Sequence, residues 1–204
     1  MIQLAPTPLV AILRGIEPTE AEVIASIVVE AEFGAIEIPL NSPDPLQSIE
    51  TIARRFGERT LVGAGTVLSP AEVDRIAGAG ARLVVAPNAN PAVIERALKL
   101  GLFVLPGVAT PTEALAALNL GASAPKLFPA EALPPEVVKA WRSVLTKGTQ
   151  LFPVGGITPE RIAPYREAGA YGFGIGGALY RPAMTRAEVE RAARAFAAAW
   201  SDAA

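Results

Sequence analysis

The sequence predicts an α/β fold, a single-domain (β/α)₈ TIM barrel that covers residues 1–204. Short apolar runs occur eight times along the chain, at a near-constant interval. Helical patterns with recognisable start and stop signals separate these runs. Eight strand–helix units in about 200 residues are typical of a small (β/α)₈ barrel. An open doubly wound sheet is the alternative, but its glycine-rich phosphate loop should follow the first strand, where this chain has Arg14-Gly15-Ile16.

The expected elements follow one another along the whole chain, with no linker between them. Strands are expected at residues 9–13, 35–39, 61–64, 82–86, 102–105, 123–128, 150–153 and 171–175. Helices are expected at residues 19–31, 71–77, 161–167 and 186–200, the last being the final helix of the barrel rather than a membrane anchor. Expected N-caps that precede a proline are Ser69 and Thr158. Left-handed glycines are expected just past four helices, at Gly34, Gly101, Gly121 and Gly169.

The composition excludes several classes of function. The formal net charge is −2, so the chain offers no basic surface for nucleic acid or an acidic membrane. It has no cysteine and no histidine, which excludes disulfides, thiol nucleophiles, Ser-His-Asp triads and the usual zinc ligands. Its aspartates, Asp44, Asp74 and Asp202, are too scattered for a carboxylate metal site. We therefore expect neither metal nor cofactor and, with no signal peptide or membrane span in the sequence, a cytoplasmic protein.

Four polar residues interrupt or end the apolar runs. Arg14 closes the first run, Glu37 lies inside the second, Thr66 follows the third and Lys126 lies inside the sixth. Strands buried on both faces should be almost wholly apolar, so these residues need a reason. Alternation along a strand turns Glu37 and Lys126 toward the barrel axis, near the carboxyl end where barrel active sites are built.

Lys126 differs from the other three lysines because only it has strand residues on both sides. A buried Glu37–Lys126 ion pair that merely holds the barrel together is the alternative to a catalytic role. Buried pairs stabilise poorly, since desolvation offsets most of their attraction, so we favour chemistry at this position. Pro125 argues against a regular central strand here, because proline cannot donate a ladder hydrogen bond.

Two glycine-rich loops predict a phosphate site. Gly155 and Gly156 follow the seventh run and lead into a helix, and Gly176 belongs to a glycine cluster at the end of the eighth. Glycines let backbone N–H groups approach an anion, and a helix N-terminus adds partial positive charge. The loops after strands seven and eight form the recurrent phosphate site of (β/α)₈ barrels.

Six motifs in this order make the chain resemble a known enzyme family. They are AILRG (11–15), EIPLNSP (37–43), GAGTVL (63–68), PGVATPTEA (106–114), KLFPAE (126–131) and VGGITPE (154–160). The chain resembles the class I 2-keto-3-deoxy-6-phosphosugar-acid aldolases, the KDPG/KDPGal aldolase family. The resemblance implies a barrel, usually a homotrimer, that cleaves a phosphorylated keto acid to pyruvate and glyceraldehyde 3-phosphate.

The same resemblance implies roles for the residues singled out above. Lys126 would form the Schiff base and Glu37 would shuttle protons. Arg14 and Thr66 would contact the keto-acid end of the substrate. Phosphate contacts would come from Gly155, Gly156 and Gly176. Pro125 departs from the pattern of the family.

The chemistry of carbon–carbon bond cleavage also favours an aldolase. Cleavage of a carbon–carbon bond beside a carbonyl leaves a carbanion, and a protonated lysine imine is a better electron sink than a ketone. With no histidine present, Glu37 is the candidate acid–base group. The alternatives are a non-cleaving phosphosugar isomerase or synthase, which needs no buried lysine, and a barrel that only binds a phosphorylated ligand.

Two positions bear on the choice between substrate epimers at C4. Asn41 stands where relatives that act on the gluconate epimer have an arginine, and Val154 stands where they have a threonine. A site without that hydroxyl loses a hydrogen-bond partner for one C4 configuration. We therefore expect the 6-phosphogalactonate substrate to be used at least as well as the gluconate epimer.

Overall fold

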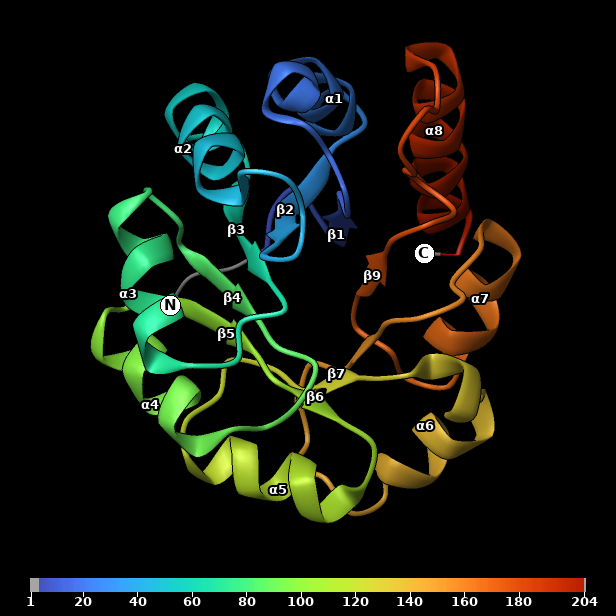
Figure 1. Ribbon diagram of the computed structural model, residues 1–204. Coiled ribbons are helices and arrows are strands. Elements are labelled where there is room, and N and C mark those ends of the chain that lie inside the picture. The colour runs from blue at the N-terminus through green and yellow to red at the C-terminus, as the bar shows by residue number, and fades with distance from the viewer. Residues whose placement is uncertain (1–3, 204) are drawn as a thin grey trace.

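The computed structural model describes residues 4–203, in which parallel strands alternate with helices (Figure 1). The strands are β1 (Thr7–Ile12), β2 (Phe33–Pro39), β3 (Leu61–Gly65), β4 (Leu83–Val85), β5 (Phe103–Leu105), β6 (Gly107–Val108), β7 (Lys126–Leu127), β8 (Phe152–Pro153) and β9 (Phe173–Ile175). The α-helices are α1 (Pro18–Glu30), α2 (Pro45–Phe56), α3 (Pro70–Gly78), α4 (Pro91–Lys99), α5 (Pro111–Asn119), α6 (Pro135–Trp141), α7 (Pro159–Glu167) and α8 (Arg186–Asp202). Each of the eight predicted strands overlaps an observed one, and β6 is an addition.

The strands form two parallel sheets. Six strands pair in the order β5-β4-β3-β2-β1-β9, and three pair in the order β6-β7-β8. A single parallel bridge, Val154 to Gly174, joins the end of β8 to β9. The predicted α/β alternation and parallel pairing are confirmed, whereas the structure shows no continuous eight-stranded ladder, so barrel closure stays a prediction. The helices lie around the outside of the strands in Figure 1.

Prolines explain why the second sheet is so short. Pro106 separates β5 from β6, Pro125 precedes β7, and Pro153 ends β8. None of them can donate a ladder hydrogen bond. Pro125 nevertheless accepts a hydrogen bond from the N–H of Phe152 at 3.1 Å, so the chain stays in register and β7 begins at Lys126.

Alternate residues along the strands belong to two separate apolar cores. Leu9, Ile36 and Ile38 pack in the larger core, which lies between the strands and the helices. Val10 and Ala35 belong to the smaller core, which gathers residues from the other face of the strands. This alternation places Glu37 on the same inner face as Ala35, as the sequence predicts.

The predicted helix ends are mostly confirmed. Ser69 caps α3 in a reciprocal capping box with Glu72, whereas Thr158 precedes α7 without a capping hydrogen bond from its side chain. Left-handed glycines follow α4, α5 and α7, at Gly101, Gly121 and Gly169.

The expected left-handed glycine after α1 is wrong. Glu32 takes the positive φ there, and Gly34 lies inside β2. A Cβ on Gly34 would come within 2.0 Å of the carbonyl oxygen of Thr7. Gly34 is therefore needed for the close approach of β1 to β2, not for the helix end. In the part of the chain from 4 to 203, no helix has the length and apolar character to span a membrane.

Candidate active site

A cleft of about 330 Å³ opens at the carboxyl ends of the strands. Its volume is in the range of small-molecule sites. Its walls come from the segments that follow β1, β3, β4, β7, β8 and β9, together with Glu37 on β2. The residues predicted for the site that line it are Arg14, Glu37, Thr66, Lys126, Val154, Gly155, Gly156 and Gly176. Asn41 is the one predicted site residue outside the lining, and it contacts Arg14.

Glu37 points from β2 into the floor of the cleft. Its side chain is 2% exposed, and its Oε2 atom has no hydrogen-bond partner. A Cβ built on Gly65 of the neighbouring strand would fall 1.3 Å from that oxygen. Glycine at position 65 is therefore required for the Glu37 carboxyl to occupy this place. The second glycine of the GAGTVL motif thus makes room for the carboxyl of the neighbouring strand.

Lys126 begins β7 and reaches the same cleft. Its N–H donates to the carbonyl of Pro106 at 2.9 Å, and its side chain is 7% exposed. Its Nζ lies 4.7 Å from the centre of the Phe128 ring, so the ring covers the lysine. Phe128 itself is partly exposed to solvent. Leu127 packs in the larger core, between the strands and the helices. The predicted inward direction of its neighbour Lys126 is therefore confirmed.

Burial moves both ionisable groups toward their neutral forms. It raises the pKa of the Glu37 carboxyl to about 7, although the charges of Lys126 and Arg14 lower it. Burial also lowers the pKa of the Lys126 ammonium; the Glu37 charge raises it and the Arg14 charge adds to the lowering. The ion pairs found within residues 4–203 join surface side chains, and none links Glu37 to Lys126. The site can therefore hold a neutral amine beside a protonated acid.

Arg14 stands at the rim of the cleft, after β1. Its Nη1 donates to the side-chain oxygen of Asn41 at 2.6 Å. The next N–H, that of Gly15, donates to the hydroxyl of Ser42 at 2.9 Å. Two consecutive residues after β2 thus hold the segment that carries the guanidinium. Ser42 was not singled out from the sequence, although it directly follows Asn41.

Thr66 follows β3 in a left-handed conformation, with φ +58°, which is uncommon for a residue with a Cβ. It faces the cleft beside Glu37 and Lys126. Residues held in such sparsely populated conformations concentrate at functional sites.

The two loop glycines Gly155 and Gly156 both have positive φ, of +114° and +57°. A Cβ on Gly155 would come within 2.3 Å of the Glu131 carboxylate, and one on Gly156 would meet both Glu131 and Arg161 at 2.9–3.0 Å. These side chains fill the back of the loop, and its front faces the cleft. Gly176 differs, since a Cβ there would meet only Ile12, at an ordinary 3.8 Å.

Seven further lining residues were not predicted as site residues from the sequence: Ile12, Pro87, Phe128, Ile157, Thr158, Gly177 and Ala178. Phe128 had a signal, because it follows Lys126 by two residues and so shares its side of the strand. Ile12 and Pro87 could not be predicted as site residues, because apolar residues are ordinary at the ends of strands.

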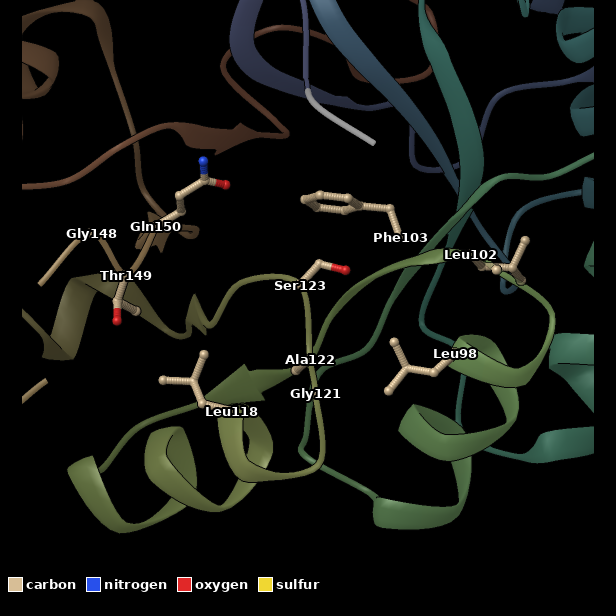
Figure 2. A pocket seen from close by; sticks show the side chains of 11 residues that line it. Leu98, Leu102, Phe103, Leu118, Gly121, Ala122, Ser123, Gly148, Thr149 and Gln150 are labelled. Carbon is tan, nitrogen blue, oxygen red and sulfur yellow. The ribbon is translucent and has the colours of Figure 1, made fainter. Parts of the chain in front are cut away.

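A second, larger pocket of about 490 Å³ opens at the opposite ends of the strands (Figure 2). Leu98 of α4 and Leu118 of α5 lie on one side of it, and Phe103 and Gln150 lie on the other. Its lining contains no titratable side chain. The chemistry therefore points to the smaller cleft. Among residues 4–203, no group of three or more metal-ligating side chains gathers anywhere.

Comparisons with known proteins agree with this geometry. A sequence model of the KDPG and KHG aldolase family matches residues 2–194. A probable 2-dehydro-3-deoxy-6-phosphogalactonate aldolase of Rhizobium meliloti (strain 1021) is 48% identical over 95% of this chain and 91% of its own. The 2-dehydro-3-deoxy-6-phosphogalactonate aldolase of Escherichia coli (strain K12) is 46% identical over 96% of each chain.

A solved structure described as "Native KDPGal structure" superposes with a TM-score of 0.97 at 45% identity. It covers 100% of this chain and 98% of its own. A family match over nearly the whole sequence and this structural agreement lead to one conclusion: the chain belongs to the KDPG and KHG aldolase family.

Proposed function

We propose that the protein is a class I aldolase that cleaves 2-dehydro-3-deoxy-6-phosphogalactonate to pyruvate and D-glyceraldehyde 3-phosphate through an imine on Lys126. The observation that carries this proposal is the placement of Lys126 and Glu37, both almost fully buried, on the floor of one cleft. The names of the two similar relatives supply the substrate.

The reaction begins when the neutral Lys126 amine attacks the C2 carbonyl of the substrate. The carbinolamine that forms loses water, with a proton supplied by Glu37, and leaves a protonated imine. Glu37, now a carboxylate, takes the proton of the C4 hydroxyl while the C3–C4 bond breaks. The bonding electrons flow into the imine to give an enamine, and glyceraldehyde 3-phosphate leaves. Protonation of the enamine at C3 and hydrolysis of the imine release pyruvate and free the lysine.

The remaining site residues bind the two ends of the substrate in this proposal. Arg14 grips the carboxylate with its guanidinium, supported by Thr66. The phosphate lies against Gly155, Gly156 and Gly176, near the start of α7, where backbone N–H groups and the helix dipole favour an anion.

Asn41 and Val154 tune the choice of epimer. Asn41 accepts a hydrogen bond from Arg14 and so holds the Arg14 guanidinium at the rim of the cleft. Val154 presents methyl groups where a hydroxyl would favour one C4 configuration. We propose that the galactonate epimer is used at least as well as the gluconate epimer.

Trapping with borohydride tests the central step. The protein is incubated with pyruvate and borohydride in the presence of EDTA, digested, and mapped by mass spectrometry. A reduced pyruvate adduct on Lys126 is expected, lost in Lys126→Met and kept in the control Lys139→Met. No adduct, or an adduct on another lysine, would reject the proposal and favour a barrel that binds or isomerises a phosphosugar without cleaving it.

Further properties belong to the same proposal. We infer that the described residues 4–203 form one domain with a closed barrel; residues 1–3 and 204 of the predicted 1–204 domain lie outside the described part. Closure is supported by contacts at both junctions of the sheets: the N–H of Ser123 donates to Val104 at 3.1 Å, and Val154 bridges Gly174.

We also expect a homotrimer in the cytoplasm. A similar solved structure, 46% identical with a TM-score of 0.96, is a cage designed by fusing symmetric oligomeric domains. Light scattering at several protein concentrations measures the oligomeric state.

A further inference from the structure

We propose that Arg161 is a positioning residue that fixes the phosphate-binding loop from behind. The inference deepens the proposed function, in which Gly155 and Gly156 contact the substrate phosphate. Arg161 is absent from the lining of the cleft, so it acts on the loop and not on the substrate itself.

Arg161 lies in the first turn of α7 and is half-buried. Its Nη1 donates to the carbonyl of Gly156 at 2.7 Å. Its Nη2 donates to the Tyr165 hydroxyl at 3.1 Å, and its guanidinium carbon lies 5.3 Å from the centre of the Tyr165 ring. One planar group thus joins the loop to a residue one helical turn later.

Tyr165 is fully buried and continues the connection inward. Its hydroxyl donates to the carbonyl of Ala130 at 2.8 Å and lies 3.0 Å from that of Leu133. The N–H of Ala130 donates in turn to the carbonyl of Val154 at 2.9 Å. The loop after β8 is therefore tied to the turn that follows Lys126.

The hydrogen bond to Gly156 sets the direction of a whole peptide unit. The Gly156–Ile157 peptide is planar, so the carbonyl held by Arg161 forces the N–H of Ile157 to point the opposite way. Two adjacent glycines otherwise leave the loop unusually free, and ordering it costs conformational entropy. Arg161 removes that freedom before the substrate arrives.

Side chains packed behind the phosphate-binding loop also restrict its conformation. Glu131 packs there beside Arg161, and a Cβ on Gly156 would meet both side chains. None of the ion pairs found within residues 4–203 involves Arg161. The guanidinium is held by the two hydrogen bonds that it donates, one to the Gly156 carbonyl and one to the Tyr165 hydroxyl. A lysine ammonium lacks the planar pair of donors and cannot make both bonds in this geometry.

The experiment compares two aldehydes in the synthetic direction, each with pyruvate: D-glyceraldehyde 3-phosphate and D-glyceraldehyde. The variants are Arg161→Lys, Arg161→Gln and Tyr165→Phe. Arg166→Lys is the matched control, since Arg166 lies on the same helix, is half-buried, donates to a carbonyl and stacks 3.9 Å from the Trp200 ring, away from the site.

Both Arg161 variants should lower the ratio of kcat/KM values, phosphorylated over unphosphorylated, by roughly ten-fold, as expected for losing one charged hydrogen bond. The loss should appear in KM for the phosphorylated aldehyde. Tyr165→Phe should move the ratio in the same direction by less, and Arg166→Lys should leave it unchanged. Pyruvate trapping on Lys126 should stay normal in every variant.

Several results would overturn the inference. An equal loss with both aldehydes means a merely structural role, and a normal ratio in Arg161→Lys means that the charge alone matters. A wild type without preference for the phosphorylated aldehyde also rejects it. Failure of the wild type to trap pyruvate would instead reject the proposed function, so the two failures are distinguishable.

Discussion

The Glu37 carboxyl occupies the space that a side chain at Gly65 would fill: a Cβ on Gly65 would lie 1.3 Å from Oε2 of Glu37. A glycine on one strand thus makes room for an ionisable group on the next.

Gly65→Ala should displace this carboxyl and lower turnover by roughly 10²-fold, the range for loss of an acid–base group. Gly78→Ala is the control, because a Cβ there meets nothing within 4 Å. The measurement is the steady-state kcat of both variants, compared with that of the wild type. Normal turnover in Gly65→Ala would show that Glu37 is free to work from another position.

Glu37→Gln should also lower turnover by roughly 10²-fold or more, since the amide keeps the volume but cannot transfer a proton. Pyruvate binding measured by calorimetry should change little, because the substrate carboxylate is held by Arg14 in the proposed mechanism. Turnover near the wild-type rate would assign proton transfer to water or to another group.

The raised pKa of Glu37 makes the stability of the fold depend on pH. The folded protein holds this proton up to about pH 7, whereas the unfolded carboxyl loses it near pH 4.5. Stability from this group is complete below pH 4.5 and is lost progressively as the pH rises from 4.5 through 7, by roughly 3 kcal/mol in all. Denaturant titrations of wild type and Glu37→Gln should therefore diverge over this window. Parallel curves would mean that Glu37 is ionised in the folded protein.

Asn41→Ala should release the guanidinium of Arg14 and raise KM for pyruvate in aldol synthesis, by roughly five-fold for one lost hydrogen bond. The effect on kcat should be smaller. Asn119→Ala, at an exposed position at the end of α5, is the control. An unchanged KM would show that Arg14 is held well enough by the segment that Gly15 and Ser42 secure.

Val154→Thr should shift the ratio of kcat/KM values for the two epimers toward the gluconate form, because it adds a hydroxyl without changing the volume. Val154 packs against Gly174, so Val154→Ala separates loss of packing from gain of the hydroxyl. The alanine variant should lower both values together. A strong gluconate preference in the wild type would contradict the proposed epimer choice.

The residues that could be predicted best from the sequence are those that contradict their surroundings. Glu37 and Lys126 are charges inside apolar strands, and the inner face that alternation gives them is the one the structure shows. Gly65 and Arg161 could not be found in this way, because their importance lies in contacts across strands and loops that periodicity does not report. Gly34 was misread because a glycine after a helix and a glycine between two close strands look the same in sequence.

The two sheets differ in length, and the site spans both. Glu37 belongs to the long ladder of β1, β2 and β3, whereas Lys126 belongs to β7, a strand of two residues in the short sheet. Amide hydrogens around Glu37 should therefore exchange with solvent only on global unfolding, while those around Lys126 should exchange through local openings. The acid–base group therefore lies on the part of the cleft wall that should be more rigid, and the nucleophile lies on the part that should open locally more often.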